Sequence, residues 1–385
     1  MIRIPENTAC YGCGVCASAC PRQIIAMDMN DEGFLVPRIG HPEACIECGI
    51  CERVCSWLDD TEVIPLDRIA PKGFSAVNRS EQLLRASSSG GVAIEIARLC
   101  IDDGRKACGV RYNAKKKRAE HFVADRMDAY MDSLGSKYLQ SHTVGAFREL
   151  MKQDCRCVIF GCPCQIDSLR RYARLKKKEA DFFFVDFFCH GVPSDLLWQS
   201  YLREQTTHWG SGDIRQVSFR DKQNGWHRFT LKLETERGVH YSPLKRHDLF
   251  YGLFLGNQCL GKACYDCKFK LTHSAADLRI GDMWGRKYVS DEQGVSGLLA
   301  LTARGQEMVS RLDVSCHLRP ERTEDVWEGQ MRRTISLPVT RKQILRALYC
   351  ERPLRSIYFR YGYKMYVKTV LPDSLKTRLK KWIRK

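Results

Sequence analysis

Cysteine is the residue type in this sequence whose number and spacing point to chemistry. The 385 residues include 20 cysteines, and the first 60 residues contain two runs with the spacing C-x2-C-x2-C-x3-C. The two runs comprise Cys10, Cys13, Cys16 and Cys20, followed by Cys45, Cys48, Cys51 and Cys55. Pro21 follows the first run, and Ser56 takes the place of that proline after the second. Such a doubled run is typical of loops that hold two 4Fe-4S clusters.

The spacing also predicts which cysteines share a cluster, because three close thiolates wrap one cubane and the fourth of each run reaches the other. One cluster is assigned to Cys10, Cys13, Cys16 and Cys55. The second cluster is assigned to Cys20, Cys45, Cys48 and Cys51. The alternative is a pair of zinc sites. Zinc usually takes four thiolates from two C-x2-4-C knuckles, whereas eight thiolates in this pattern fit two cubanes.

Further cysteines lie where a third cluster could form. Cys162 and Cys164 lie between an apolar stretch that looks like a strand and a stretch that looks like a helix. Cys189 lies in the same place in the next strand–helix unit, and residues 264–267 form a C-x2-C loop. Because ligand groups gather at the carboxyl edge of such sheets, these thiols can converge. We predict a third 4Fe-4S cluster held by Cys164, Cys189, Cys264 and Cys267. Cys162 and Cys259 remain alternative ligands.

The remaining cysteines fit better as buried or incidental thiols. They are Cys100, Cys108, Cys155, Cys157, Cys316 and Cys350.

The elements that must position these cysteines form two domains and a tail. Residues 1–60 are predicted to be a two-cluster ferredoxin domain with a hairpin over 23–37, and residues 59–72, with two prolines and no periodicity, indicate a linker. Residues 73–330 alternate strand and helix patterns, so the fold class is α+β or α/β. Residues 331–385 are predicted to be a basic, aromatic-rich helical tail.

Within the body, the strongest patterns predict specific strands and helices. The predicted strands are 106–112, 157–161 and 181–188. The predicted helices are 92–103, 143–153, 165–176 and 194–205.

A serine- and glycine-rich turn at 87–91 opens the first of those helices. Its hydroxyls and free backbone N–H groups would lie at a helix N-terminus, where an anionic phosphate is favoured. The alternative is an ordinary capped helix, which the same residues also suit.

At these residues the chain resembles the beta-subunit family of hydrogenases and dehydrogenases for the deazaflavin coenzyme F-420, from about residue 76 to residue 312. The resemblance is carried, in order, by SSSGGV, GSKYLQS (135–141), the G-x-PCQI-x-x-L run (161–169), CHGVPS (189–194), C-x-x-C-K-F (264–269) and ADLRIGDMWG (276–285). The family also occurs fused behind a two-cluster ferredoxin, as here.

The resemblance implies a flavin, usually FAD with FMN as the alternative, and one 4Fe-4S cluster in the body. It maps the cluster ligands onto Cys164, Cys189, Cys264 and Cys267. The implied flavin contacts are Ser88, Ser89, Gly90, Gly91, Lys137, Tyr138, Gln140 and Ser141, with Lys137 placed to compensate a phosphate or the reduced ring. Family members often have threonine where this chain has Cys162, which leaves the ligand set open at that run.

These features predict an iron–sulfur flavoprotein oxidoreductase. Clusters carry single electrons, whereas a flavin exchanges one or two, so it would convert between them. An external redox protein is expected to reduce the N-terminal clusters, and the flavin to act on a small-molecule substrate. His190 and Asp282 are candidate proton-handling residues, and either could instead satisfy a buried hydrogen bond. The resemblance suggests a deazaflavin or an intermediate of a surface-polysaccharide pathway as substrate. The alternative function is an electron-transfer subunit without substrate chemistry.

Charge and hydropathy limit where in the cell the protein is expected and which partners it is expected to bind. The formal net charge is +17, but residues 341–385 contain fourteen basic and two acidic residues, so the excess belongs to the tail and nucleic-acid binding is not expected. The start MIRIPENTACYG has no basic-then-apolar leader, which predicts a cytoplasmic protein. Leu375, Leu379, Trp382 and Ile383 share one face of a predicted terminal helix. That helix suits an anionic membrane surface and docking on its own protein equally well.

Overall fold

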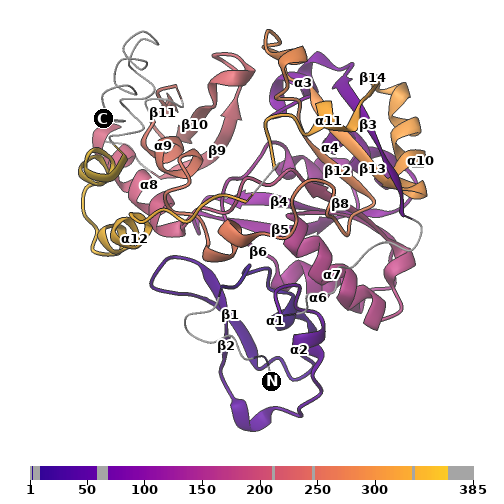
Figure 1. Cartoon of the computed structure of the whole chain (residues 1–385), viewed down its shortest axis with the longest axis horizontal. Coiled ribbons are helices and arrows are strands. Elements are labelled where there is room, and N and C mark those ends of the chain that lie inside the picture. Colours follow the sequence, from indigo (N-terminus) through magenta and orange to yellow (C-terminus); the bar gives the residue numbers. More distant parts are fainter. Residues whose placement is uncertain are drawn as a thin grey trace, which may run out of the picture.

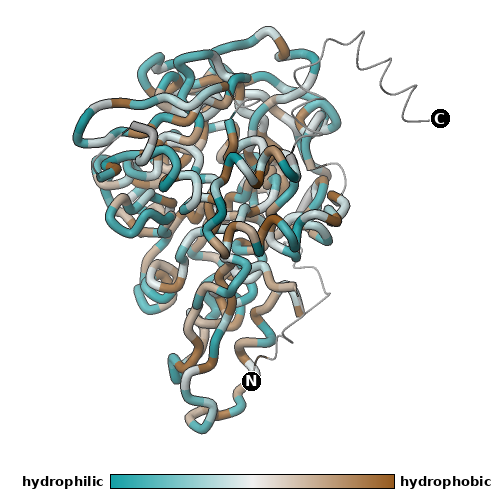
Figure 2. The backbone as a smooth tube through the Cα atoms, turned by 90° about the vertical axis from the view of Figure 1, so that its left-hand side faces the viewer, coloured by the Kyte–Doolittle hydropathy of each residue, from teal (hydrophilic) through white to brown (hydrophobic). Residues whose placement is uncertain are grey.

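The N-terminal module is a narrow domain that projects from a larger body (Figure 1; Figure 2). The structure is a computed structural model, and it describes residues 2, 9–58, 68–209, 213–244, 248–331 and 334–362. In the module, α1 (Val15–Ala19) and α2 (Ile50–Arg53) each begin after a glycine within a cysteine run, and β1 (Ile25–Met29) pairs antiparallel with β2 (Leu35–Ile39). The predicted hairpin is therefore confirmed.

A nine-stranded mixed sheet forms the centre of the body, with strand order β14-β3-β13-β12-β8-β7-β4-β5-β6. Its four central strands run parallel to one another: β12 (Leu278–Asp282), β8 (Phe182–Phe187), β7 (Cys157–Gly161) and β4 (Lys106–Asn113). The flanking strands are β14 (Cys316–Glu321), β3 (Arg68–Asn78), β13 (Ser296–Thr302), β5 (Arg118–Ala124) and β6 (Ser141–His142). The predicted strands of the body correspond to β4, β7 and β8.

Helices cover both faces of this sheet, which is why its central strands read as continuous apolar runs. In β8, Phe182 and Phe184 face one core and Phe183 and Val185 face the other. The first core is covered by α6 (Val144–Lys152) and α7 (Pro163–Leu175). The second is covered by α3 (Glu81–Ala86), α4 (Val92–Asp102), α5 (Met127–Tyr130) and α10 (Ala303–Arg311).

A second, smaller layer lies beside the sheet and has an aromatic core that includes Trp198, Tyr201 and Phe250 (Figure 1). It consists of α8 (Asp195–Trp209), the antiparallel strands β9 (Ile214–Asp221), β10 (Thr230–Thr235) and β11 (Gly238–Tyr241), α9 (Leu249–Leu255), α12 (Arg341–Tyr349) and α13 (Leu354–Ile357). All four predicted helices of the body are thus confirmed, as α4, α6, α7 and α8. The described part of the predicted tail packs into this layer, since Ile344, Leu348 and Leu354 are buried in its core.

Two other predictions from the sequence, the linker and the terminal helix, have different outcomes. Strand β3 begins at Arg68, so the last part of the predicted linker 59–72 belongs to the sheet. Pro71 has no backbone N–H to donate, and β3 tolerates it for two reasons. Strand β14 pairs with β3 only from Gly73 onwards, and the pairing of β3 with β13 has a register shift beside Pro71. The predicted terminal amphipathic helix lies outside the described residues. No helix in the described part of the chain is long and apolar enough to cross a membrane.

The N-terminal domain is fixed to the body by hydrogen bonds to its cluster-binding loops. Thr143 Oγ1 donates to the carbonyl of Cys13 (2.8 Å), and the Arg148 guanidinium donates to the carbonyl of Ala17 (2.8 Å). Gly14 has φ 75°, and a Cβ there would collide with Thr143 Oγ1, so this close approach requires glycine. The cysteine loops therefore have a defined position relative to the sheet.

The hairpin supplies a second attachment. Arg341 forms a bidentate ion pair with Glu32 (3.0 and 2.7 Å) and donates from Nε to the carbonyl of Leu260 (2.9 Å). Its guanidinium also lies over the rings of Phe34 and Tyr265. This arginine joins α12, the hairpin and the segment before Cys264 in one contact.

Candidate functional site

The eight N-terminal cysteines surround two small cavities. The cavity between α1 and the segment after α2 is lined by Cys10, Cys13, Cys16 and Cys55. The cavity at the outer end of the module is lined by Cys20, Cys45, Cys48 and Cys51. These are the two ligand sets that the spacing predicts, and each offers the four thiolates that a cubane requires.

The four cysteines predicted for a third cluster lie against the first of these sets. Burial, followed by the thiols of Cys13, Cys189 and Cys267, raises the pKa of Cys164. Burial and then Cys189 likewise raise the pKa of Cys264 to about 12. These thiols therefore share one buried region, at the N-terminus of α7, the loop after β8 and the 3-10 turn Lys262–Asp266.

Cys162 lies close to the third set but in a different role from Cys164. Its thiol hydrogen-bonds to Cys189. This contact is the largest cause of two pKa shifts: it lowers the pKa of Cys189 to about 7 and raises the pKa of Cys162 well above its ordinary value. Cys162 and Cys189 are therefore in direct contact. Cys259, the other alternative, is fully buried in the aromatic core of the second layer.

The arrangement suits clusters in which each thiolate binds a different iron. Within the described residues, no three His, Cys, Asp or Glu side chains converge closely enough to share one metal ion. The ligands of a cubane need not converge in that way, because they surround a four-iron core. The N-terminal donor sets therefore fit two clusters, and the third set offers four further thiols.

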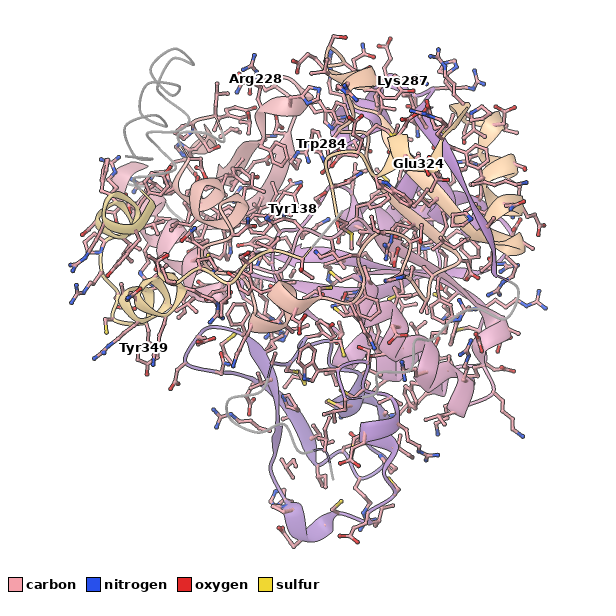
Figure 3. The ribbon with its side chains drawn as sticks, in the orientation of Figure 1. Tyr138, Arg228, Trp284, Lys287, Glu324 and Tyr349 are labelled. Atoms are coloured by element: carbon pink, nitrogen blue, oxygen red, sulfur yellow. The ribbon has the colours of Figure 1, made fainter. Side chains whose placement is uncertain are left out.

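A large cavity begins at the third set and extends between the nine-stranded sheet and the second layer. Its volume is about 1200 Å³, and Cys162, Cys189 and Lys270 lie in its lining. Tyr138 and Trp284, which also line it, lie near the middle of the molecule between the two layers (Figure 3). Pockets for drug-sized ligands measure roughly 300–1,000 Å³, so this cavity has room for a dinucleotide together with a second molecule.

The serine- and glycine-rich turn also lines this cavity, through Ser88, Ser89 and Gly91 ahead of α4. Ser88 Oγ accepts from the amide of Ser136 (2.8 Å), which ties the turn to the 135–141 segment. Gly91 is the N-cap of α4 with φ 79°, a conformation that favours glycine. Gly90 instead packs against the backbone of β3 and β13, where a Cβ would collide with the carbonyl of Ala76.

The predicted contacts in the 135–141 segment divide into two groups. Lys137, Tyr138 and Ser141 line the cavity. Among the described residues that line the cavity, Gln140 is absent, because its side-chain amide binds the N-terminal domain. Its Oε1 accepts from the amide of Leu35 (2.7 Å), and its Nε2 donates to the carbonyl of Tyr11 (3.4 Å). Its amide therefore lies at the domain interface, and its role as a flavin contact stays a prediction.

Lys137 is held by its own loop. Its Nζ donates to the carbonyls of Asp132 (3.2 Å), Leu134 (2.9 Å) and Gly135 (3.0 Å). Burial lowers its pKa to about 7. Because those carbonyls already accept its three N–H groups, the lysine would act on an anion through its charge.

The two candidate proton-handling residues, His190 and Asp282, both line the cavity but differ in their hydrogen bonding. Asp282 accepts from Trp226 Nε1 (2.9 Å) and from the Arg220 guanidinium (3.3 Å), so both of its oxygens are engaged. His190 packs edge-on against Phe254, with ring centroids 5.2 Å apart, and its Nε2 has no hydrogen-bond partner among the described residues. Burial, and then the charge of Lys270, lowers its pKa. Of the two residues, His190 is the one whose ring nitrogen Nε2 has no hydrogen-bond partner among the described residues.

The sequence did not reveal the wall opposite His190. Arg220 comes from β9, and its guanidinium lies 3.8 Å from the ring centroid of Phe229 and 5.1 Å from that of Trp284. It also donates to Tyr138 Oη (3.1 Å). Trp284 stacks on Trp226 with centroids 5.0 Å apart. Tyr138 and Trp284 belonged to motifs, whereas no local pattern marks Arg220.

The comparisons with known proteins agree with this arrangement. Residues 154–324 match the family model for the C-terminal part of the beta subunit of "Coenzyme F420 hydrogenase/dehydrogenase". Residues 9–57 match the model of the "4Fe-4S dicluster domain". The chain is therefore related to an iron–sulfur electron-transfer family, with a segment similar to a dicluster domain in front of a segment similar to that beta subunit.

One solved structure with similarity to the chain is described as "Xenon derivatization of the F420-reducing [NiFe] hydrogenase complex from Methanosarcina barkeri". The similarity has a TM-score of 0.48 and 18% sequence identity, over 74% of this chain and 89% of that one. At that level nothing about the hydrogenase complex transfers to this chain. No curated protein sequence matches.

Proposed function

We propose that the chain is a flavin-dependent iron–sulfur oxidoreductase with three 4Fe-4S clusters. The order of its thiol sets supports this proposal. The set at the outer end is followed by the set around Cys13, then by Cys164 beside it, and finally by Cys189 in the wall of the cavity. Single electrons from an external redox protein would follow this order inward.

The cavity supports a flavin and a substrate as its ligands. A bound flavin would supply the exchange between single electrons and an electron pair. The cationic side chains of Lys137, Arg220 and Lys270 and the N-terminus of α4 would hold its phosphates and balance negative charge on its ring. His190 would hold a proton at Nε2 beside the third set, and Asp282 would orient Arg220. A pure electron carrier has no need of such a cavity.

The proposal is tested by purifying the full chain without oxygen and measuring iron, sulfide and flavin per chain. We expect about twelve irons, from four in each cubane, and about one flavin. Eight irons and no flavin after reconstitution with FAD and FMN would contradict it. Turnover with a candidate small molecule would then separate an oxidoreductase from a carrier, since a reduced carrier leaves the small molecule unchanged.

The charge of Lys137 makes flavin affinity depend on pH. The lysine is cationic below its pKa of about 7 and neutral above it. Its attraction for a flavin anion is therefore present at low pH and lost as the pH rises through 7, at a cost on the order of 1 kcal/mol, or roughly fivefold in affinity. Lys137→Gln should flatten this dependence in a fluorescence titration at pH 6 and pH 8.5. Lys152→Gln, at an exposed site on α6, should leave it intact.

A further inference from the structure

Tyr11 belongs to the first cysteine run, but its side chain leaves that loop for the body. It is buried to 9% exposure in a small cluster with Ala9, Ala263 and Phe269, against which Cys164 and Cys267 pack. Its ring stands edge-on to Trp57, with centroids 5.2 Å apart, and tilted to Phe269 at 5.7 Å. The residue that follows cluster ligand Cys10 therefore contacts the third thiol set.

The Tyr11 hydroxyl has no hydrogen-bond partner among the described residues. The phenol keeps its proton at physiological pH, since the ordinary pKa of a tyrosine is about 10. The backbone amide of Lys268 lies close to the hydroxyl, and an amide N–H can donate to its oxygen but cannot accept its proton. A buried O–H without an acceptor is costly, and native proteins rarely leave one.

We infer that the Tyr11 hydroxyl donates a hydrogen bond to a sulfur of the third cluster. The inference rests on the third cluster of the proposed function. Thiolates and sulfides of a cubane carry negative charge and accept hydrogen bonds, and the O–H lies beside the two ligands that pack on the ring. The acceptor that the described residues do not offer would thus be supplied by the cluster.

Such a contact would set the potential of the third cluster. A hydrogen bond to sulfur stabilises the reduced cluster, which carries one more negative charge, and so raises its potential. The loop that carries Tyr11 is itself held in place, because Gln140 Nε2 donates to its carbonyl. Tyr11 is therefore a positioning residue that connects the first cluster loop to the third cluster and favours electron transfer inward.

The test uses the full-length holoprotein and its Tyr11→Phe variant in an EPR-monitored redox titration. The substitution conserves the ring and removes only the hydroxyl. We expect the equilibrium constant for reducing the third cluster to fall about tenfold, which is about 59 mV for a one-electron couple. The N-terminal clusters should keep their potentials. The matched control is Tyr112→Phe, which removes another buried hydroxyl without a partner among the described residues, in the aromatic core beside Trp198, and should shift no cluster.

The outcomes separate this inference from the function on which it rests. Wild-type protein with eight irons and no third EPR signal would refute both. A third cluster whose potential is the same in wild type and Tyr11→Phe, or a shift confined to an N-terminal cluster, would refute the inference alone. If the variant loses iron, ENDOR of wild-type protein with ring-deuterated tyrosine decides the matter. A deuterium coupling to the reduced third cluster is expected, and its absence would overturn the contact.

Discussion

Cys164→Ser is expected to remove the third cluster and lower the iron content from about twelve to about eight per chain, with the N-terminal clusters intact. Serine is a poor ligand for a cubane, so the variant keeps only three of the four thiolates that hold the cluster. Electrons from the N-terminal domain would then have no carrier beside the cavity. We expect flavin reduction by a protein donor to slow by at least about a hundredfold, measured by stopped-flow absorbance.

Cys162→Ser is the matched control, because it changes the same atom two residues away. A sulfur that hydrogen-bonds to Cys189 lies too close to it for the two to bind different irons of one cubane. Cys162 is therefore expected to retain its proton and donate to the cluster ligand, and serine can do the same. This variant should keep about twelve irons. Loss of iron from Cys162→Ser, with retention in Cys164→Ser, would exchange the roles of the two residues.

The features that the sequence predicted well are those set by local spacing. The grouping of the N-terminal cysteines follows from two short runs, and the structure arranges the same groups around two cavities. The central strands were visible because a strand covered on both faces, such as β8, is apolar at nearly every position. The start of α4 at Val92 was marked by the serine- and glycine-rich turn before it.

The features that the sequence did not predict depend on contacts between distant segments. The sequence predicted Gln140 as a ligand contact because it lies in a family motif. In the structure its amide hydrogen-bonds to Leu35 of the N-terminal domain, which is 105 residues away in the sequence. Prolines made 59–72 look like a linker, although pairing with β13 extends β3 into it. Arg220 becomes part of the cavity wall only when β9 of the second layer packs against Trp284. None of these contacts leaves a periodic signal.

Arg279→Met is expected to cost about 3–5 kcal/mol of unfolding free energy, because it leaves Asp186 as a buried, uncompensated charge. Both side chains are fully buried, and Arg279 donates from Nε and a terminal nitrogen to the two Asp186 oxygens at 2.7 Å each. The same guanidinium donates to the carbonyls of Leu271 and His273, shortly after cluster ligand Cys267. The variant should therefore also lose the iron of the third cluster before it unfolds. Chemical denaturation of the anaerobic holoprotein and iron analysis measure the two effects.

The contribution of the stranded charge can be separated from that of the lost carbonyl contacts. Asp186→Leu combined with Arg279→Met removes both charges, and apolar replacement of a buried pair is often close to neutral. We expect the double variant to recover a large part of the unfolding free energy lost in Arg279→Met. Its third cluster should remain weakened, because the carbonyls of Leu271 and His273 still lack their donor. Equal instability of the single and double variants would show that Arg279 acts through the loop carbonyls and not through Asp186.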